Sequence, residues 1–366
     1  MSKLLSGVWF SDDVSVAALD RLLQQALGAG ARALMILACD RNELDPNAIS
    51  PILERLEVPV CGGVFPAVLY RQRQHERGYL VCGFARELKV ETFASLTELT
   101  RLAPQARGEG LVVLVDGLGR QVDAFITALY GLLGPGTPVF GGGAGSLSLE
   151  QRPCLICNQG LYADGAQLIW WPEPVEVGVR HGWETLAGPF LVTEAADNLL
   201  HSLNFRPALQ VYSEALAPHL DPSPDQLPFS EIARIYPFGM EKLDDQILVR
   251  DPIRAEGEAL LCVGKVPVHA MVNILHGESQ TLIEAASETV DAHWAGSKRQ
   301  PLAFLFDCVS RKLFLGERFD DELAAIRARL PEDALLIGAL TLGEIANSAG
   351  GPIQFHNRTA VVGVSD

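Results

Sequence analysis

Three segments of the chain repeat one order of elements, and this repeat constrains the fold more than any other feature. Apolar runs without alternation, typical of strands covered on both faces, occupy residues 33–40, 110–119 and 301–311. Each run leads through an acidic or polar turn into a helical stretch, at 46–57, 121–133 and 320–330. A second strand with small residues follows at 58–67, 137–146 and 334–344, and then a further apolar strand at 78–85, 153–160 and 359–366.

Short connections of this kind favour right-handed strand–helix–strand units, and strands joined without a helix are expected to pair antiparallel. We therefore predict an α/β fold of mixed β-sheets with helices on the faces, built from repeated strand–helix–strand units. Two tandem domains are expected, residues 1–200 and 201–366. The helix of the third unit should bury Leu323, Ile326 and Leu330, with Asp320 as its N-cap.

The middle of the chain has a different pattern. Residues 191–203 (LVTEAADNLLHSL) predict a helix capped by Thr193, and a second helix should begin near Pro207. The segment at 220–228 is rich in Pro, Asp and Ser and predicts a surface loop. Residues 258–264 and 266–275 predict two strands joined by a turn at Gly264.

Composition narrows the class of protein. The net charge of −16 over 366 residues argues against a nucleic-acid partner, because neutralising phosphates supplies most of that affinity. The sequence shows no signal peptide and no apolar run of the roughly 18 residues that cross a bilayer. Seven cysteines, an odd number, indicate reduced buried thiols. Together these features predict a cytoplasmic protein with no membrane partner.

The segment VFGGGAGSLSL (139–149) resembles a phosphate-binding loop but lacks its chemistry. It has no lysine, its first cationic residue is Arg152, and it leads into another strand instead of a helix. Close backbone packing is the simpler interpretation, because small residues recur at the same place in all three units. A ligand could still use the bare backbone at Gly142 and Gly143.

Polar residues at strand ends of the third unit are the candidates for ligand binding. Arg311 could hold a carboxylate and Glu344 an amino group, which together would suit an amino acid; an ordinary salt bridge is the alternative. His356 and Asn357 could line the same crevice, and Cys308 could contact a ligand from its turn. Asp40, Asp116 and Asp307 recur at one strand end, where turn carboxylates that accept backbone amides would explain all three.

The sequence offers no motif for catalysis. It contains no GxSxG elbow and no HExxH pair, and Cys154 and Cys157 lie on a strand without the second pair that a zinc site needs. We therefore expect a binding protein, not an enzyme. A hydrolase remains the alternative.

Several motifs together resemble the FIST sensory domain, with its N-terminal and C-terminal halves in tandem. They are GGGAG, the HGW…LVTEA…RPAL segment, CVSR, the GEI triplet and HNRT, in that order over residues 30–366. The loop LGEIANSAGGPIQ departs from the family in being short and free of aromatic residues before Phe355.

The resemblance implies a signal-input module that binds a small ligand, for which amino acids have been suggested. FIST domains typically sit beside kinase, chemotaxis or cyclic-dinucleotide output domains, so a separate partner such as a histidine kinase is expected here. A subset binds haem and senses nitric oxide. If haem binds, the axial candidates are His181, His269 and His356, and the absence of CxxCH excludes covalent attachment.

Overall fold

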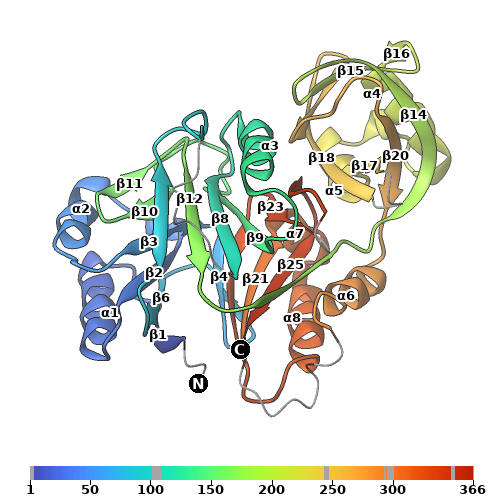
Figure 1. The fold of residues 1–366 in the computed structure, drawn as a ribbon. Coiled ribbons are helices and arrows are strands. Elements are labelled where there is room, and N and C mark those ends of the chain that lie inside the picture. The colour runs from blue at the N-terminus through green and yellow to red at the C-terminus, as the bar shows by residue number, and fades with distance from the viewer. Residues whose placement is uncertain are drawn as a thin grey trace.

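The structure is a computed structural model that describes residues 4–100, 109–242, 247–291, 294, 301–347 and 351–365. The described chain forms three six-stranded mixed sheets and one seven-stranded sheet. Figure 1 shows the seven-stranded sheet as a separate barrel at upper right, with the mixed sheets filling the rest of the molecule. The predicted α/β fold with mixed sheets is confirmed.

The first mixed sheet follows the first predicted unit. β2 (Ala33–Cys39) is parallel to β3 (Val60–Phe65) and antiparallel to β6 (Tyr79–Phe84), and α2 (Pro46–Glu54) connects β2 to β3. Every residue of β2 is buried, which explains its unbroken apolar run. The edges are β1 (Leu5–Ser11), beside β6, and the hairpin of β10 (Leu155–Cys157) and β11 (Gly160–Tyr162), beside β3; α1 (Val16–Gly28) lies against β1.

The second and third sheets repeat this layout. Their central strands, corresponding to β2, are β8 (Gly110–Asp116) and β21 (Leu302–Cys308). The parallel neighbours are β9 (Val139–Ala144) and β22 (Leu335–Thr341), and the antiparallel neighbours are β12 (Ala166–Trp171) and β25 (Ala360–Ser365). One edge of the second sheet is β7 (Lys89–Phe93), and one edge of the third sheet is β13 (Val175–Arg180). The helix α3 (Val122–Leu133) connects β8 to β9, and the helices α7 (Val309–Leu315) and α8 (Phe319–Ala328) connect β21 to β22.

Each unit gives a hairpin to another unit's sheet. β4 (Ala67–Tyr70) and β5 (Arg73–His75) follow β3 along the chain but join the third sheet beside β22. β10 and β11 follow β9 but join the first sheet, and β23 (Glu344–Ala346) and β24 (Gln354–His356) follow β22 but join the second. The three exchanges close a circle, and we call the three mixed sheets together the ring.

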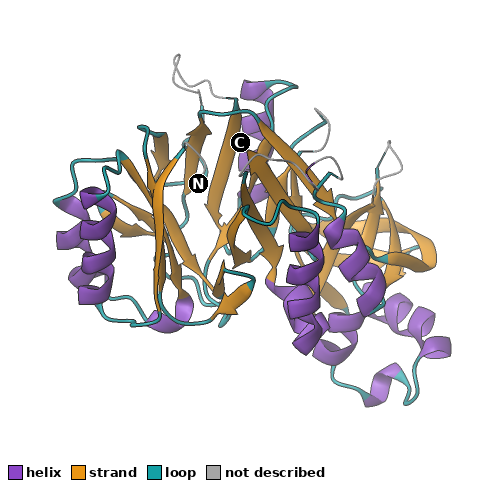
Figure 2. Cartoon of the chain, turned by 90° about the horizontal axis from the view of Figure 1, so that it is seen from below, coloured by secondary structure: helices purple, strands orange, loops and turns teal. Residues whose placement is uncertain are grey.

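An aromatic cluster joins the three sheets of the ring. Trp171 of the second sheet packs edge-on against Phe84 of the first and Phe304 of the third, with ring centroids 5.7 and 5.5 Å away. Phe140 and Phe306 extend the cluster. The helices lie outside the strands, as Figure 2 shows from below.

Three equivalent glycines explain why small residues recur in the second strand of each unit. A Cβ on Gly62, Gly141 or Gly338 would lie 1.9, 1.9 or 1.8 Å from the carbonyl oxygen of the residue paired with it on the central strand. No side chain fits at such a distance, so the close packing predicted for the glycine-rich segments is confirmed at these positions.

Two details of the ring differ from the sequence predictions. The strand predicted at 153–160 is the hairpin strand β10, and the counterpart of β6 and β25 in the second sheet is β12. Asp320 is not an N-cap, because α8 begins at Phe319 and its N-cap is Arg318. Leu323, Ile326 and Leu330 are buried as predicted, and all seven cysteines are buried free thiols.

The barrel is a continuous segment inserted between β13 and the third unit. Its strands are β14 (Glu184–Ala196), β15 (Leu199–Leu203), β16 (Arg206–Pro207), β17 (Phe238–Glu241), β18 (Ile247–Glu256), β19 (Ala259–Val263) and β20 (Met271–His276). β14 pairs with both β20 and β15, so the sheet closes on itself around its own core. Glu184 pairs with His276, so the two ends of the insertion lie side by side.

Residues 191–203 form strands of the barrel, and the helix predicted there is wrong. β14 and β15 meet in a tight turn, where Asp197 takes the left-handed conformation with φ 56°. The predicted helix near Pro207 is present as α4 (Ala208–Leu216), and the strands predicted on either side of Gly264 are β19 and β20. The predicted tight turn between them is wrong, because residues 264–270 form a longer loop and the two strands do not pair with each other. The boundary predicted after residue 200 falls inside β15. Two other helices, α5 (Phe229–Ile235) and α6 (Ser279–Ser287), lie beside β18 and α8.

Candidate functional site

The three strand-end aspartates have different environments. Asp116 accepts hydrogen bonds from the backbone amides of Leu118 (3.0 Å) and Asp164 (2.8 Å), and Asp40 accepts one from Leu147 (3.2 Å). These two are the predicted turn carboxylates. Asp307 is not, because it has no solvent exposure and neither of its carboxylate oxygens has a hydrogen-bond partner. Burial, followed by the charge of Glu322, raises its pKa well above the usual range, which favours the protonated acid.

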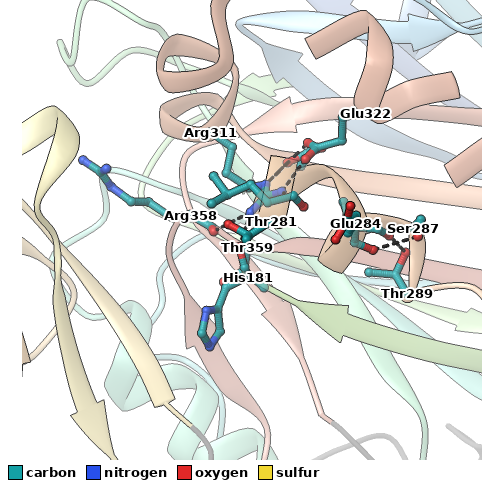
Figure 3. Close-up of polar contacts among 12 residues, drawn as sticks. His181, Thr281, Glu284, Ser287, Thr289, Arg311, Glu322, Arg358 and Thr359 are labelled. Atoms are coloured by element: carbon teal, nitrogen blue, oxygen red, sulfur yellow. Dashed lines mark hydrogen bonds and ion pairs between the residues drawn. The ribbon is translucent and has the colours of Figure 1, made fainter. Parts of the chain in front are cut away.

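Arg311 lies beneath the surface in a network of protein atoms. Its guanidinium is fully buried, forms an ion pair with Glu322 of α8, and donates to the carbonyl oxygens of His181 (2.6 Å) and Leu282 (3.0 Å). Figure 3 shows the Arg311–Glu322 pair, with the guanidinium of Arg358 pointing away from it. Arg311 and Glu344 therefore do not open onto a shared crevice, which corrects the predicted arrangement; the salt-bridge alternative applies, with Glu322 as the partner.

Glu344 is also fully buried. Its carboxylate accepts from Thr341 Oγ1 (2.8 Å) and from the backbone amide of Thr359 (3.3 Å). Burial raises the pKa of Glu344 to about 8, although these two hydrogen bonds and one from the Cys308 thiol act in the opposite direction. Burial and the Glu344 charge raise the pKa of Cys308 well above its usual range, so this thiol remains protonated at neutral pH.

The backbone of the glycine-rich segment is already hydrogen-bonded to another part of the protein. Gly143 N donates to Gly343 O (2.8 Å), and Gly143 O accepts from Leu342 N (2.9 Å). A Cβ on Gly142 would lie 2.7 Å from Thr341 Cγ2, and one on Gly143 would lie 2.3 Å from Leu342 O. The two glycines thus let β9 approach the end of β22 and the residues that follow it, and β23 (Glu344–Ala346) covers the backbone that a ligand would need.

A cavity of about 470 Å³ lies where the ring meets the barrel. The ring contributes the chain after β8 and β9 and the segments that follow β21 and β22, including Cys308 and Leu342. The barrel contributes α5 and β18, with residues such as Arg234 and Ile253, and Asn357 and Arg358 line the cavity from the loop before β25. This crevice lies at the carboxyl ends of strands in the third unit, the place where the sequence predicts ligand binding and where open α/β sheets bind ligands.

The wall of the crevice is mainly apolar and unusually exposed. Leu147, Leu149, Ile253 and Leu313 line it and are 43%, 51%, 38% and 45% exposed. They come from three separate parts of the chain: the loop after β9, β18 and α7. Exposed apolar side chains that gather around one cavity are typical of a binding site for a small molecule.

A buried ion pair joins the barrel to the ring at this crevice. Arg358 donates from Nε to Asp251 Oδ1 (2.8 Å), from Nη1 to Arg234 O (2.6 Å) and from Nη2 to Ala233 O (2.8 Å). Its guanidinium also lies 5.1 Å from the centre of the Trp183 ring. Asn357 completes the junction, because its Oδ1 accepts from the backbone amide of Asp251 (3.3 Å).

Comparison with protein families assigns both parts of the molecule. A model of the FIST N domain matches residues 33–206, and a model of the FIST C domain matches residues 208–347. The chain belongs to the FIST family. FIST domains are sensory modules of signal transduction that respond to small ligands. No curated protein matches the chain significantly.

The FIST assignment raises the question of haem, for which His181, His269 and His356 are the candidate axial residues. None of His181, His269 and His356 lines the crevice between the ring and the barrel. His181 Nδ1 accepts from the backbone amide of Trp183 (2.9 Å), and His269 is an exposed barrel residue with φ 71°. Burial is the main reason that the pKa of His181 is lowered to about 4 and that of His356 to about 3. The positive charge of Arg311 lowers the pKa of His181 further, and that of Arg250 lowers the pKa of His356 further. Both imidazoles are therefore neutral at pH 7.

No group of three or more His, Cys, Asp or Glu side chains in the described residues is arranged to hold a metal ion. Among the same residues, no helix is both long and apolar enough to span a bilayer.

Sequence reasoning placed Cys308 and Asn357 at the crevice and missed Arg358, Asp251 and the apolar rim. Arg358 directly follows the predicted His356 and Asn357 in the HNRT motif, so its position gave a usable signal. The barrel residues gave none, because β18 is far from the third unit in sequence and only the fold brings it there.

Proposed function

We propose that this FIST protein is a cytoplasmic sensor that binds an amino acid or a similar small metabolite in the crevice between the ring and the barrel. In this proposal it passes the signal to a separate output protein, a histidine kinase or a cyclic-dinucleotide enzyme. The observation that carries the proposal is the apolar cavity shared by the strand ends of the ring and by β18 and α5 of the barrel. Its volume of about 470 Å³ is within the range of small-molecule sites.

The position of the crevice supports a signalling role. A ligand held between two bodies contacts both, so its binding favours the relative placement that offers the most contacts. The Arg358–Asp251 pair and the Trp183 ring lie directly at this junction. A change in the placement of the barrel relative to the ring would also move the outer surface of the barrel, which an output protein could contact.

Binding without turnover fits the chemistry of the lining residues. The lining groups that could act as nucleophiles are Cys308 and hydroxyls such as that of Ser310. The raised pKa of Cys308 keeps its thiol protonated, and no histidine in the described part of the chain lines the crevice to activate a serine. We therefore propose a binding protein and not a hydrolase.

The test blocks the mouth of the crevice without touching the buried core. Amino acids and related carboxylic acids are first screened for stabilisation of the full chain against heat, and binding of any hit is measured by calorimetry. In the double variant Leu149→Trp/Leu313→Trp, two exposed rim leucines become larger, and binding should weaken at least about tenfold. Unchanged affinity in this variant would place the ligand elsewhere and contradict the proposal.

A matched control uses exposed apolar residues outside the crevice. Val14 and Leu132 are 36% and 41% exposed and do not line the cavity. The double variant Val14→Trp/Leu132→Trp therefore adds the same two indoles to the surface and should bind as the unmodified protein does.

A further inference from the structure

The proposed function names an amino acid or a similar small metabolite as the ligand, and the charges around the crevice narrow this choice. We infer that the crevice takes a small amphipathic anion, an aliphatic or aromatic body that carries one carboxylate and no ammonium group. The inference rests on the proposed function, since it concerns the same crevice.

The apolar body of the ligand follows from the walls. More than half of the side chains that line the cavity are Leu, Ile, Val, Ala or Pro, and four of them are exposed in the free protein. Covering this surface with a hydrocarbon group removes it from water and favours binding. A fully polar guest, such as a sugar or a free phosphate, would leave these walls unmatched.

The negative charge follows from the balance of ionised lining groups. Among the described residues, three arginines line the cavity, Arg234, Arg254 and Arg358, against one carboxylate, that of Asp251. The chain as a whole carries −16, so an anion is repelled by most of the surface and attracted to this crevice. A site with excess positive charge on such an acidic protein is best matched by an anionic ligand.

The arginines differ in how far the protein already occupies them. Arg358 is committed to Asp251 and to two backbone carbonyls. Arg254 forms a pair with Glu256 in which the side chains are 66% and 40% exposed, and such exposed pairs are weak and exchange readily. Arg234 is exposed and has no ion-pair partner among the described residues, so its guanidinium is the group best placed to receive a carboxylate.

The same balance of lining charges disfavours a ligand that carries an ammonium group. A bound ammonium needs a carboxylate partner, and the one carboxylate of the lining is already engaged by Arg358 through two nitrogens. Its neighbours on the wall are further guanidinium groups, which repel a cation. The deaminated form of an apolar amino acid therefore suits the crevice better than the amino acid itself.

The experiment compares compounds that share one hydrocarbon skeleton and differ only in charge. For the leucine skeleton these are isocaproate, leucine, isoamylamine and isocaproamide, and for the aromatic skeleton they are phenylpropionate, phenylalanine and phenethylamine. Calorimetry with the full chain should show the two carboxylates binding at least about tenfold more tightly than the other compounds. Equal or tighter binding of the amino acids, or no binding of either carboxylate, would overturn the inference.

A substitution then tests the assigned group. Arg234→Met keeps an apolar stem and removes the charge, and it should weaken carboxylate binding about tenfold and reduce its dependence on salt. Arg77→Met is the control, since Arg77 is an exposed arginine outside the crevice and its loss changes the net charge equally. Equal effects of the two variants would show that only overall charge matters and would contradict the inference.

Failure of the inference and failure of the proposed function give different results. If an amino acid or an amine binds and the Leu149→Trp/Leu313→Trp variant blocks it, the crevice is the ligand site and only the anionic class is wrong. If the carboxylates bind and this variant leaves their affinity unchanged, the site itself is wrong.

Discussion

Arg311 shows how a residue that is predicted to bind ligand can serve the fold instead. It forms a buried ion pair with Glu322 and donates to three backbone carbonyls, from His181, Leu282 and Arg358. These contacts hold together α8, α6 and the loops before β14 and β25. Removing one partner of a buried pair leaves the other charge desolvated and alone, which costs far more than the net stabilisation from the intact pair.

The first prediction concerns this pair. Arg311→Met should lower the free energy of unfolding by about 3–5 kcal/mol, measured by urea denaturation, because Glu322 is left buried without its partner. The double variant Arg311→Met/Glu322→Leu should recover much of the loss, since neither charge of this pair remains and the raised pKa of Asp307, which lies 3.4 Å from Arg311, lets that acid stay protonated. Arg318→Met, which breaks an exposed pair with Asp321, should cost less than about 1 kcal/mol. A loss for Arg311→Met as small as that for Arg318→Met would show that the pair contributes little.

The second prediction concerns pH. The pKa of Glu344 is about 8 in the folded protein, above its value in the unfolded chain, so the folded state binds its proton more tightly. Its contribution is fully favourable at low pH and is lost as pH rises through about 8, with a slope of at most about 1.4 kcal/mol per pH unit. Glu344→Gln should remove this dependence.

The measurement is the difference in unfolding free energy between Glu344→Gln and the unmodified protein from pH 5 to 9. That difference cancels the opposite effect of His181 and His356, whose lowered pKa values destabilise the fold as pH falls below their unfolded value. We expect Glu344→Gln to gain stability relative to the unmodified protein as pH rises. A constant difference would mean that Glu344 ionises normally.

At this scale the sequence contained one signal that could have identified the true partner of Arg311. Helix α8 buries Phe319, Glu322, Leu323 and Ile326 on one face, so a glutamate occupies a place where the helical period demands an apolar residue. A carboxylate on a buried face requires a buried cation. Arg311 and Asp307, spaced four residues apart, were identified from sequence as strand-end groups, but only the packing of α8 showed which group paired with which.

At the scale of the elements, the strand–helix–strand unit could be predicted from the sequence, whereas the strands that pair with it could be predicted only in part. Unbroken apolar runs predict β2, β8 and β21, and the glycines of β3, β9 and β22 mark the strand that lies closest to each. The helix predicted at 191–203 failed because Leu199, Leu200 and Leu203 fit a helical face as well as they fit β15. The turn at Asp197 and Asn198 was the local signal that favoured a hairpin.

The third prediction tests the close approach that defines the unit. Gly141→Ala would place a Cβ 1.9 Å from Val113 O in a backbone conformation with φ 151°, so β8 and β9 would have to separate. We expect loss of cooperative unfolding or of soluble protein. Gly131→Ala is the control: it lies in α3 with nothing within 4 Å of the new Cβ, and it should stabilise the protein by about 0.5–1 kcal/mol. Normal stability of Gly141→Ala would show that the strands can yield.

For the whole molecule, the exchange of hairpins could not be read from the sequence. Each hairpin leaves the unit that precedes it and pairs with a strand from a different part of the chain, as β4 pairs with β22. Local patterns specify the strands, whereas the pairing is decided by which arrangement buries all three apolar faces around Trp171 and its aromatic neighbours. The exchange links the three sheets of the ring to one another, so we expect the ring to unfold as one body, while the barrel has a core of its own.

The last prediction separates these two bodies. A fragment of residues 184–276 keeps every strand of the barrel, retains its core around Leu200 and Phe238, and has ends that already lie side by side. It should unfold cooperatively in a denaturant series followed by circular dichroism, with slow amide exchange in β14 and β20.

A fragment of residues 1–206 tests the opposite case. It retains β4 and β13 but lacks β22 and β25, with which they pair, and it lacks β23, which pairs with β9. The exposed strand edges should make it aggregate or remain without slow-exchanging amides, even though it contains the whole FIST N match. A cooperatively folded 1–206 fragment would mean that the first two sheets are stable without the exchanged hairpin. A barrel fragment that fails to fold would mean instead that the Arg358–Asp251 junction is needed for the stability of the barrel as well as for the shape of the crevice.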